Sequence, residues 1–110
     1  PEGAAAACDV LAQMPGWRIL VTPGMIDLGE QQEQFNHWLG THAASCADEV
    51  LLVGGKQVQP LRQGLVEGGF DEDRIRQVMT MQDAFTCFEQ SPHADKVVLI
   101  ENDVPDVLNR

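Results

Sequence analysis

Basic side chains are scarce in this sequence. Its 110 residues include 7 lysines and arginines against 17 aspartates and glutamates, for a formal net charge of -10. Nucleic acids and anionic membrane surfaces are bound mainly through cationic side chains, so this balance argues against both as partners. Long apolar runs are missing as well, since none approaches the roughly 18 residues that a membrane-spanning helix requires. We therefore expect no nucleic acid and no membrane partner.

Cysteines are few, and their number is odd. Cys8, Cys46 and Cys87 are widely spaced and lie in apolar stretches, which favours reduced, half-buried thiols in a cytoplasmic protein over a disulfide framework. The first 14 residues lack the basic and leucine-rich regions of a signal peptide. Because the chain starts at Pro1 and not at methionine, we expect it to be a piece of a longer protein.

What the chain does contain is a regular alternation of helical and strand patterns. With 44% hydrophobic residues it can form one folded domain over residues 1–110. The apolar spacing predicts helices over 2–14, 29–47, 58–67 and 81–90, and strands over 18–22, 49–53, 74–78 and 96–100. An alternation of this kind predicts an α/β fold, with a mainly parallel sheet between two helical layers and right-handed crossovers.

Two of the predicted helices have a clear apolar stripe. In the first helix the stripe consists of Ala4, Cys8, Leu11 and Met14. In the second it consists of Phe35, Trp38, Leu39, Ala43 and Cys46. Residues at this spacing share one face of a helix, so we expect these side chains to face the core.

The loops at one edge of the predicted sheet define the candidate site. In parallel sheets ligands gather at the carboxyl ends of the strands, and the loops 22–29, 54–56 and 101–106 leave these ends. Asp27 precedes a helix, where it could bind a ligand or only cap the helix. Lys56 follows two glycines and could receive a phosphate or carboxylate, or be solvated. The run 101–103, Glu-Asn-Asp, could bind an amino group or magnesium, or only form a turn.

Motifs for other chemistries are absent. Lys56 follows a glycine, but Val50 takes the place of the first glycine of a phosphate-binding P-loop, and Gln57 that of its hydroxyl residue. The dinucleotide fingerprint G-x-G-x-x-G is missing after every strand, and so are the acids and lysine of a phospho-receiver domain. Neither Cys46 nor Cys87 has an identifiable base, so we expect no nucleophile.

The three histidines do not predict a metal site. His37 and His42 are five residues apart on one predicted helix, whereas side chains three or four apart lie on the same face. His93 falls in a loop that we expect to be exposed. No Cys-x-x-Cys or His-x-x-x-His spacing occurs, and we therefore expect surface histidines and no metal ligands.

Two stretches resemble the C-terminal domain of the Mur ligase family, and its MurF type most. The first is P-E-G-A-A-A-A-C-D-V-L-A-Q-M-P-G-W-R-I-L-V-T-P-G-M-I-D-L-G, residues 1–29, and the second is D-E-V-L-L-V-G-G-K-Q, residues 48–57. The MurF type typically has R-I-A-V-L-G-D-M-x-E-L-G and V-G-K-Q at these places. Asp27 stands for the glutamate, and one glycine is inserted before Lys56. The resemblance covers nearly the whole chain and is strongest in its first half.

The resemblance implies a Rossmann-like three-layer α/β/α domain, the last of three in an ATP-dependent amide-forming ligase of peptidoglycan precursor synthesis in the cytoplasm. In the family, ATP and magnesium bind mainly to a central domain, which here would lie before Pro1. The carboxylate of a UDP-muramyl-peptide-like substrate becomes an acyl phosphate, and the amine of an amino acid or dipeptide attacks it. The C-terminal domain contacts substrate and nucleotide and supplies no catalytic residue, so alone it should be inactive.

The chain also departs from the family pattern. The acid that helps to hold the nucleotide corresponds to Gly24, and a frequent histidine corresponds to Asn36. A terminal K-G-S is replaced by residues 101–103, which reverses the local charge. The chain thus resembles a divergent subgroup, whose acceptor need not be D-alanyl-D-alanine.

We predict a substrate- or nucleotide-binding role for Gly24, Asp27, Lys56, Asn102 and Asp103, and no residue that binds metal. The main alternative is a stand-alone Rossmann-like module that binds a ligand or a protein without ligase activity. A folylpolyglutamate-synthetase-like ligase is a further alternative, but the T-P-G-M-I-D-L-G run fits it less well.

Overall fold

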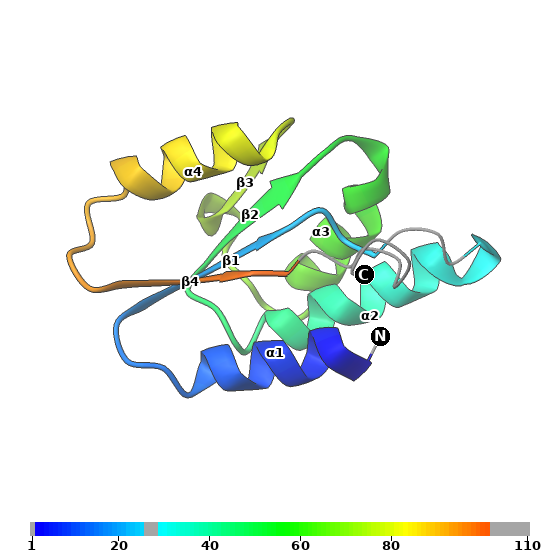
Figure 1. The fold of residues 1–110 in the computed structure, drawn as a ribbon. Coiled ribbons are helices and arrows are strands. Elements are labelled where there is room, and N and C mark those ends of the chain that lie inside the picture. Colours follow the sequence, from blue (N-terminus) through cyan, green and yellow to red (C-terminus); the bar gives the residue numbers. More distant parts are fainter. Residues whose placement is uncertain (1, 26–28, 102–110) are drawn as a thin grey trace, which may run out of the picture.

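A four-stranded parallel sheet forms the centre of the domain (Figure 1). The computed structural model describes residues 2–25 and 29–101. Along the sheet the strands lie in the order β3-β2-β1-β4, and all three neighbouring pairs are parallel. Their bounds are β1 Trp17–Thr22, β2 Glu49–Val53, β3 Ile75–Val78 and β4 Lys96–Ile100. The predicted strands and their parallel arrangement are confirmed.

Helices cover both faces of this sheet (Figure 1). One face carries α1 (Glu2–Ala12), α2 (Gln32–Ala43) and α3 (Gln59–Glu67), and the other carries α4 (Met81–Gln90). The short 3-10 turns η1 (Gly29–Gln31), η2 (Lys56–Val58) and η3 (Glu72–Arg74) precede α2, α3 and β3. The predicted three-layer α/β/α architecture is confirmed. In the described part of the chain, no helix combines the length and apolar character that crossing a membrane requires.

The two central strands supply buried side chains to both faces of the sheet. Along β1, Leu20 faces α1, α2 and α3, whereas Ile19 and Val21 face α4, and all three are at most 1% exposed. Successive side chains of a strand point to opposite faces of the sheet. A continuous apolar run therefore supplies buried side chains to both faces. Full burial of each of these side chains contributes roughly 1.5–3 kcal/mol.

Two of the apolar positions expected in the core are exposed. Trp38 and Met14 are each 44% exposed, so those two predictions were wrong. α1 ends at Ala12, because the amide of Met14 turns back to the carbonyl of Leu11 before Pro15. Trp38 lies outside the buried face of α2, which consists of Asn36, Leu39, Gly40 and Ala43.

Helices α2 and α3 cross at two buried glycines. A Cβ atom at Gly40 would overlap the backbone carbonyl oxygen of Leu61, and one at Gly64 would overlap that of His37. Because neither residue has a side chain, the two helix backbones touch directly. This contact determines how closely the amino-terminal ends of α2 and α3 approach each other.

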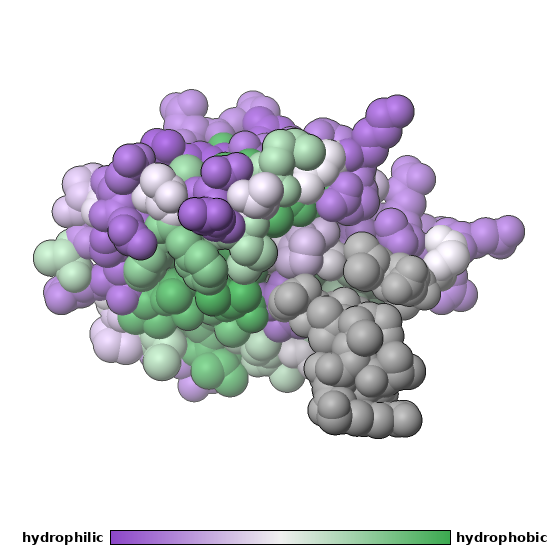
Figure 2. Space-filling view, turned by 45° about the horizontal axis from the view of Figure 1, so that its top comes forward, coloured by the Kyte–Doolittle hydropathy of each residue, from purple (hydrophilic) through white to green (hydrophobic). Residues whose placement is uncertain are grey.

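The apolar face of the sheet extends past the helices at β4. Every side chain of β4 is at least partly exposed, whereas four residues of β1 and four of β2 are buried. Figure 2 shows apolar side chains gathered over β4 and α1. They line an open groove of ≈ 300 Å³, formed by Ala7, Val10, Leu11, Met14, Val97, Val98 and Leu99.

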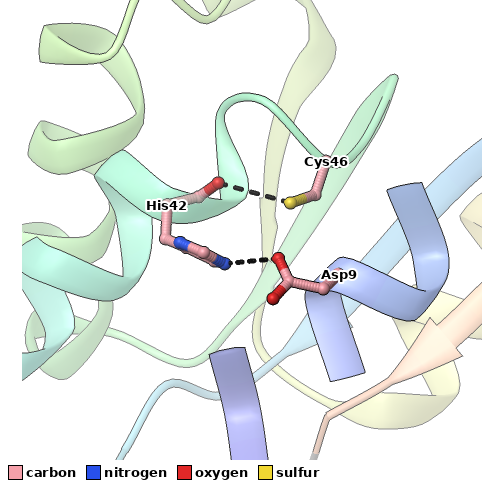
Figure 3. A group of neighbouring side chains, drawn as sticks. All are labelled: Asp9, His42 and Cys46. Atoms are coloured by element: carbon pink, nitrogen blue, oxygen red, sulfur yellow. Dashed lines mark hydrogen bonds and ion pairs between the residues drawn. The ribbon is translucent and has the colours of Figure 1, made fainter. Parts of the chain in front are cut away.

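Polar contacts connect the helices on this face to each other. His42 in the last turn of α2 lies with its Nε2 2.9 Å from Oδ1 of Asp9 on α1 (Figure 3). His37 makes a similar 3.0 Å contact with Glu67 on α3. Both carboxylates are at least half exposed, so each pair contributes little to stability.

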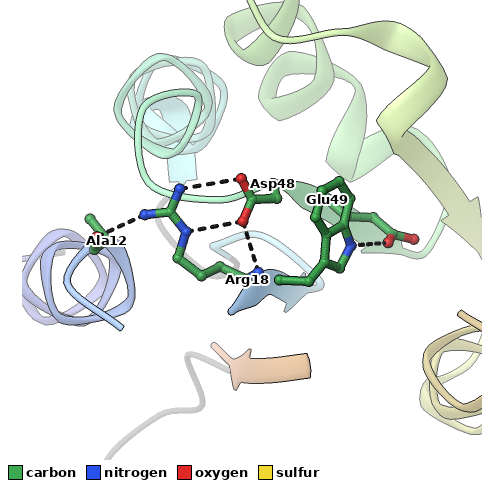
Figure 4. Close-up of polar contacts among 5 residues, drawn as sticks. Ala12, Arg18, Asp48 and Glu49 are labelled. Atoms are coloured by element: carbon green, nitrogen blue, oxygen red, sulfur yellow. Dashed lines mark hydrogen bonds and ion pairs between the residues drawn. The ribbon is translucent and has the colours of Figure 1, made fainter. Parts of the chain in front are cut away.

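The amino ends of the two central strands are held by one carboxylate (Figure 4). Asp48 accepts hydrogen bonds from the backbone amide of Arg18 at 2.9 Å and from its guanidinium at 3.1 and 3.2 Å. The guanidinium also donates to the carbonyl of Ala12 at 2.7 Å, which anchors the end of α1. Beside them, the Trp17 indole donates to Glu49 at 2.8 Å. Hydrogen bonding to Arg18 holds the pKa of Asp48 below its usual range.

The close crossing of α2 and α3 predicts that adding one methyl group there destabilises the domain. Gly64→Ala should lower the free energy of unfolding by about 2–3 kcal/mol, because the helices must separate. Gly3→Ala is the matched control: Gly3 is also helical, but a Cβ there meets nothing within 4 Å. It should be neutral or stabilising by up to about 1 kcal/mol. Urea unfolding measures both, and equal stability of the two variants would contradict the crossing.

The Asp48 contact predicts a specific pH dependence. Because the folded-state pKa of Asp48 is lowered, its contribution is complete above the unfolded-state value of about 3.9. It is lost as the pH falls through the lower folded-state pKa. Asp48→Asn should therefore cost about 1–2 kcal/mol at pH 7, and the difference from wild type should shrink below about pH 4.

Urea titrations between pH 7 and pH 3 measure this difference. The matched control is Glu89→Gln on the exposed end of α4, which should change stability by less than about 0.5 kcal/mol. A cost for Asp48→Asn that stays constant down to pH 3 would rule out the charged contact as its source.

Candidate functional site

The carboxyl edge of the sheet begins with a tight turn after β1. Thr22 accepts a 3.0 Å hydrogen bond at its hydroxyl from the amide of Gly24. Gly24 has a φ of +78°, in the left-handed region that favours glycine, and a Cβ there would press on Asn36 at 3.1 Å. The Thr-Pro-Gly sequence therefore turns the chain away from β1 directly against α2.

A buried amide side chain joins this turn to the neighbouring loop. Asn36 of α2 is 0% exposed. Its Oδ1 accepts from the amide of Met25 at 2.6 Å, and its Nδ2 donates to the Met25 carbonyl at 3.0 Å. Nδ2 also donates to the carbonyl of Gln57, after β2, at 3.4 Å. Asn36 thus fixes the loops that follow β1 and β2 relative to each other.

The double-glycine loop after β2 is closed by amide side chains. Gln57 accepts from the amide of Gly55 at 3.1 Å and donates to the carbonyl of Val53 at 3.4 Å. Gln77 of β3 donates to the carbonyl of Gly54 at 2.8 Å. Gly54 has a φ of +124°, which a residue with a side chain rarely adopts. The loop is a closed turn, and it sets the position of Lys56.

Lys56 lines an open hollow of ≈ 410 Å³ between the starts of α2 and α3. Its side chain is exposed and makes no hydrogen bond or ion pair within residues 2–25 and 29–101. The lining consists of Gly29, Glu30, Gln32, Glu33, Asn36, Lys56, Gln57 and Pro60. The hollow is thus lined by one cation and two carboxylates.

The structure describes two of the five residues predicted to bind a ligand. Gly24 and Lys56 both lie at the carboxyl edge, and Asn36 separates them. Gly24 is buried and contacts Asn36, whereas Lys56 is accessible to a ligand. Asp27, Asn102 and Asp103 lie outside the described residues. The backbone of Glu101 extends the sheet, with its amide 2.9 Å from the carbonyl of Val21.

Asn36 is the site residue that the sequence interpretation left without a role. Its spacing to Leu39 and Ala43 is that of the core-facing stripe, so a polar residue occurs where an apolar one is expected. A buried side-chain amide almost always has hydrogen-bond partners. A polar residue at an apolar position of the helix was therefore the signal in the sequence for the role of Asn36.

The cysteines provide no activated nucleophile at this edge. Burial raises the pKa of the Cys8 thiol to about 12 and also raises that of Cys46. Both are at most 3% exposed. The one group of metal-ligating side chains within the described residues, Asp9 with His42 and Cys46, lies between α1 and the end of α2. It is therefore distant from the hollow, which lies at the start of α2.

The fold is similar to that of MurF from Acinetobacter baumannii, a solved structure. It superimposes on 93% of this chain with a TM-score of 0.68 and 20% sequence identity. The match covers 22% of the MurF chain, so this chain spans about a fifth of that protein's length. Neither a protein-family model nor a characterised protein sequence matches the chain. The shared feature is thus the fold of part of the MurF chain.

The Asn36 contacts predict a local effect on the candidate site. Asn36→Ala leaves the buried amide and carbonyl of Met25 without partners, and should lower the free energy of unfolding by about 2–3 kcal/mol. Hydrogen exchange at the Met25 amide should become faster than at the Glu101 amide, which is bonded to Val21. Gln34→Ala, on the exposed face of the same helix, is the control and should cost less than about 0.5 kcal/mol. Unchanged exchange at Met25 would contradict the role of Asn36.

Proposed function

We propose that this chain is the C-terminal, substrate- and nucleotide-contacting domain of a MurF-like, ATP-dependent amide-forming ligase of peptidoglycan precursor synthesis. The observation that carries the proposal is the similarity in fold to MurF over 93% of the chain. The resemblance of residues 1–29 and 48–57 to the Mur ligase pattern supports it independently. We expect the ligase to act in the cytoplasm and to include further domains before Pro1.

The chemistry of the hollow supports a ligand with charges of both signs. Lys56 is accessible there and can pair with a carboxylate or phosphate. Glu30 and Glu33 are exposed, line the same hollow and can attract an ammonium group. An amino acid or dipeptide carries both groups, so the hollow suits the incoming acceptor of an amide-forming ligase.

The described residues could bind only part of the nucleotide. Lys56 can neutralise one phosphate, but the loop around it uses its own amide side chains to close its turn, and only one lysine follows the glycines. Most of the ATP and its magnesium would be held by other domains of the ligase. When bound, ATP supplies the phosphoryl group that activates the substrate carboxylate.

In this proposal the domain works by placing reactants. The amine that attacks belongs to the acceptor, so a catalytic side chain in this chain is not required. Lys56 would hold the carboxylate or phosphate and screen its negative charge, while Glu30 and Glu33 would orient the ammonium group of the acceptor, which releases a proton to solvent before its nitrogen attacks. Rigid placement of two reactants can supply a large part of a rate enhancement. The Asn36 contacts provide that rigidity at the loops.

The proposal is tested in the complete ligase, encoded by the natural reading frame that contains this chain. The assay measures phosphate release with a UDP-muramyl-tripeptide and with single amino acids or D-alanyl-D-alanine. Lys56→Ala should raise the KM for the acceptor or ATP about 10-fold or more, because a charge-assisted contact is lost. Arg62→Ala is the control: this cation on α3 does not line the hollow, and its loss should leave both constants unchanged.

Two results would contradict the proposal. The first is a reading frame that begins close to Pro1, which would leave a stand-alone binding module. The second is a ligase in which Lys56→Ala and Arg62→Ala have the same kinetic constants as wild type.

A further inference from the structure

Three side chains of different chemistry meet between α1 and the end of α2. Asp9 belongs to α1, His42 to the last turn of α2, and Cys46 to the turn that follows α2. The ligand atoms of the three residues all lie within 4.8 Å of one another. Figure 3 shows the carboxylate and the imidazole facing each other, with the thiol above them on the same side.

We infer that Asp9, His42 and Cys46 form a three-ligand binding site for Zn²⁺. An oxygen, a nitrogen and a sulfur donor make a combination that zinc accepts, whereas magnesium and calcium select oxygen donors alone. Three protein ligands leave the fourth position of a tetrahedral ion to water. The inference does not depend on the proposed function, because the group lies at the opposite end of α2 from the hollow.

The spacing of the donors requires only a small adjustment. Zinc bond lengths of roughly 2.0–2.3 Å place neighbouring ligand atoms of a tetrahedron about 3.3–3.7 Å apart. Here Nε2 of His42 is 2.9 Å from Oδ1 of Asp9, in a hydrogen bond that the ion would replace. The Asp9 side chain is 61% exposed and can rotate, and it also leaves a path for the ion from solvent. Cys46, at 3% exposure, forms the buried wall.

The electrostatic surroundings favour a cation. The C-terminal end of a helix carries partial negative charge on its free carbonyls, and the carbonyl of His42 accepts the Cys46 thiol at 3.4 Å. An aspartate and a thiolate together would neutralise the two charges of zinc. Arg18 is a cation that acts electrostatically on Cys46. Its positive charge is already paired with Asp48, and its guanidinium also donates to the Ala12 carbonyl.

Proton balance is simple at this site. Burial raises the pKa of Cys46, so without metal the group is a thiol. Zinc binding exchanges the S–H bond for a Zn–S bond and releases the proton to solvent. His42 binds as the neutral imidazole, and Trp38 stacks on its ring at a centroid distance of 5.5 Å, which limits its rotation.

The same helix offers a matched control. His37 forms a similar contact with Glu67 at 3.0 Å, but no cysteine belongs to a ligand group there in the described residues. The two histidines therefore differ in the one feature that the inference requires. Cys87, the most exposed of the three cysteines, is the control for thiol chemistry in general.

Titration of the purified chain with Co²⁺, and competition by Zn²⁺, tests the inference. Co²⁺ should produce a near-ultraviolet sulfur-to-metal charge-transfer band at one ion per chain, and zinc should abolish it. Saturating zinc should also raise Tm by about 5 °C or more. Cys46→Ser and His42→Gln should remove the band, and Asp9→Asn should weaken binding at least ~10-fold. His37→Gln and Cys87→Ser should retain both the band and the affinity.

Clear results would overturn the inference. They are the absence of a charge-transfer band, a band that survives in Cys46→Ser, or a band lost equally in Cys87→Ser or His37→Gln. Asp9 is exposed, so Asp9→Asn is expected to fold and keeps the test decisive if a variant at Cys46 does not. If Asp9→Asn binds Co²⁺ as tightly as wild type, the three-ligand site is wrong.

Discussion

The direct backbone contact between α2 and α3 at Gly40 and Gly64 determines where the candidate site lies. With any side chain at these positions the helices would move apart, and their amino-terminal ends with them. Asn36 could then no longer reach both Met25 and the carbonyl of Gln57. The hollow around Lys56 lies between these same helix ends. Two missing Cβ atoms in the core therefore control the geometry of a surface site.

The two edges of the sheet differ in a way that matters for function. At the amino edge, Arg18, Asp48 and the Ala12 carbonyl satisfy one another, and the Trp17 indole pairs with Glu49. At the carboxyl edge the backbone is equally well tied by Asn36, but Lys56 is left accessible. Polar groups that pair with one another suit stability, whereas a fixed loop with an accessible charge suits ligand binding. The inferred zinc site would add a further connection, between α1 and α2, on the side of the amino edge.

Much of the fold could be predicted from the sequence, because β1 and β2 are buried on both faces and short loops separate the elements. Trp38 and Met14 were misplaced, since apolar spacing alone does not show where a helix ends or which edge of its stripe meets the sheet. The importance of Asn36 depends on loops that only the tertiary fold brings together. His42 and Cys46 are four residues apart, but their partner Asp9 comes from another helix, so no local spacing could reveal the group of three.

The strand order has a consequence for the synthesis of this chain. Within this domain β1 is translated before the other strands, yet its two neighbours in the sheet are β2 and β4, and Trp17 pairs with Lys96 near the far end of the described residues. Until that last strand has been translated, one edge of the central strand β1 is left unpaired. Nascent chains with such an edge are prone to associate with one another. The window for aggregation therefore spans almost the entire translation of the domain, and chaperone binding in that interval would protect the β1 edge.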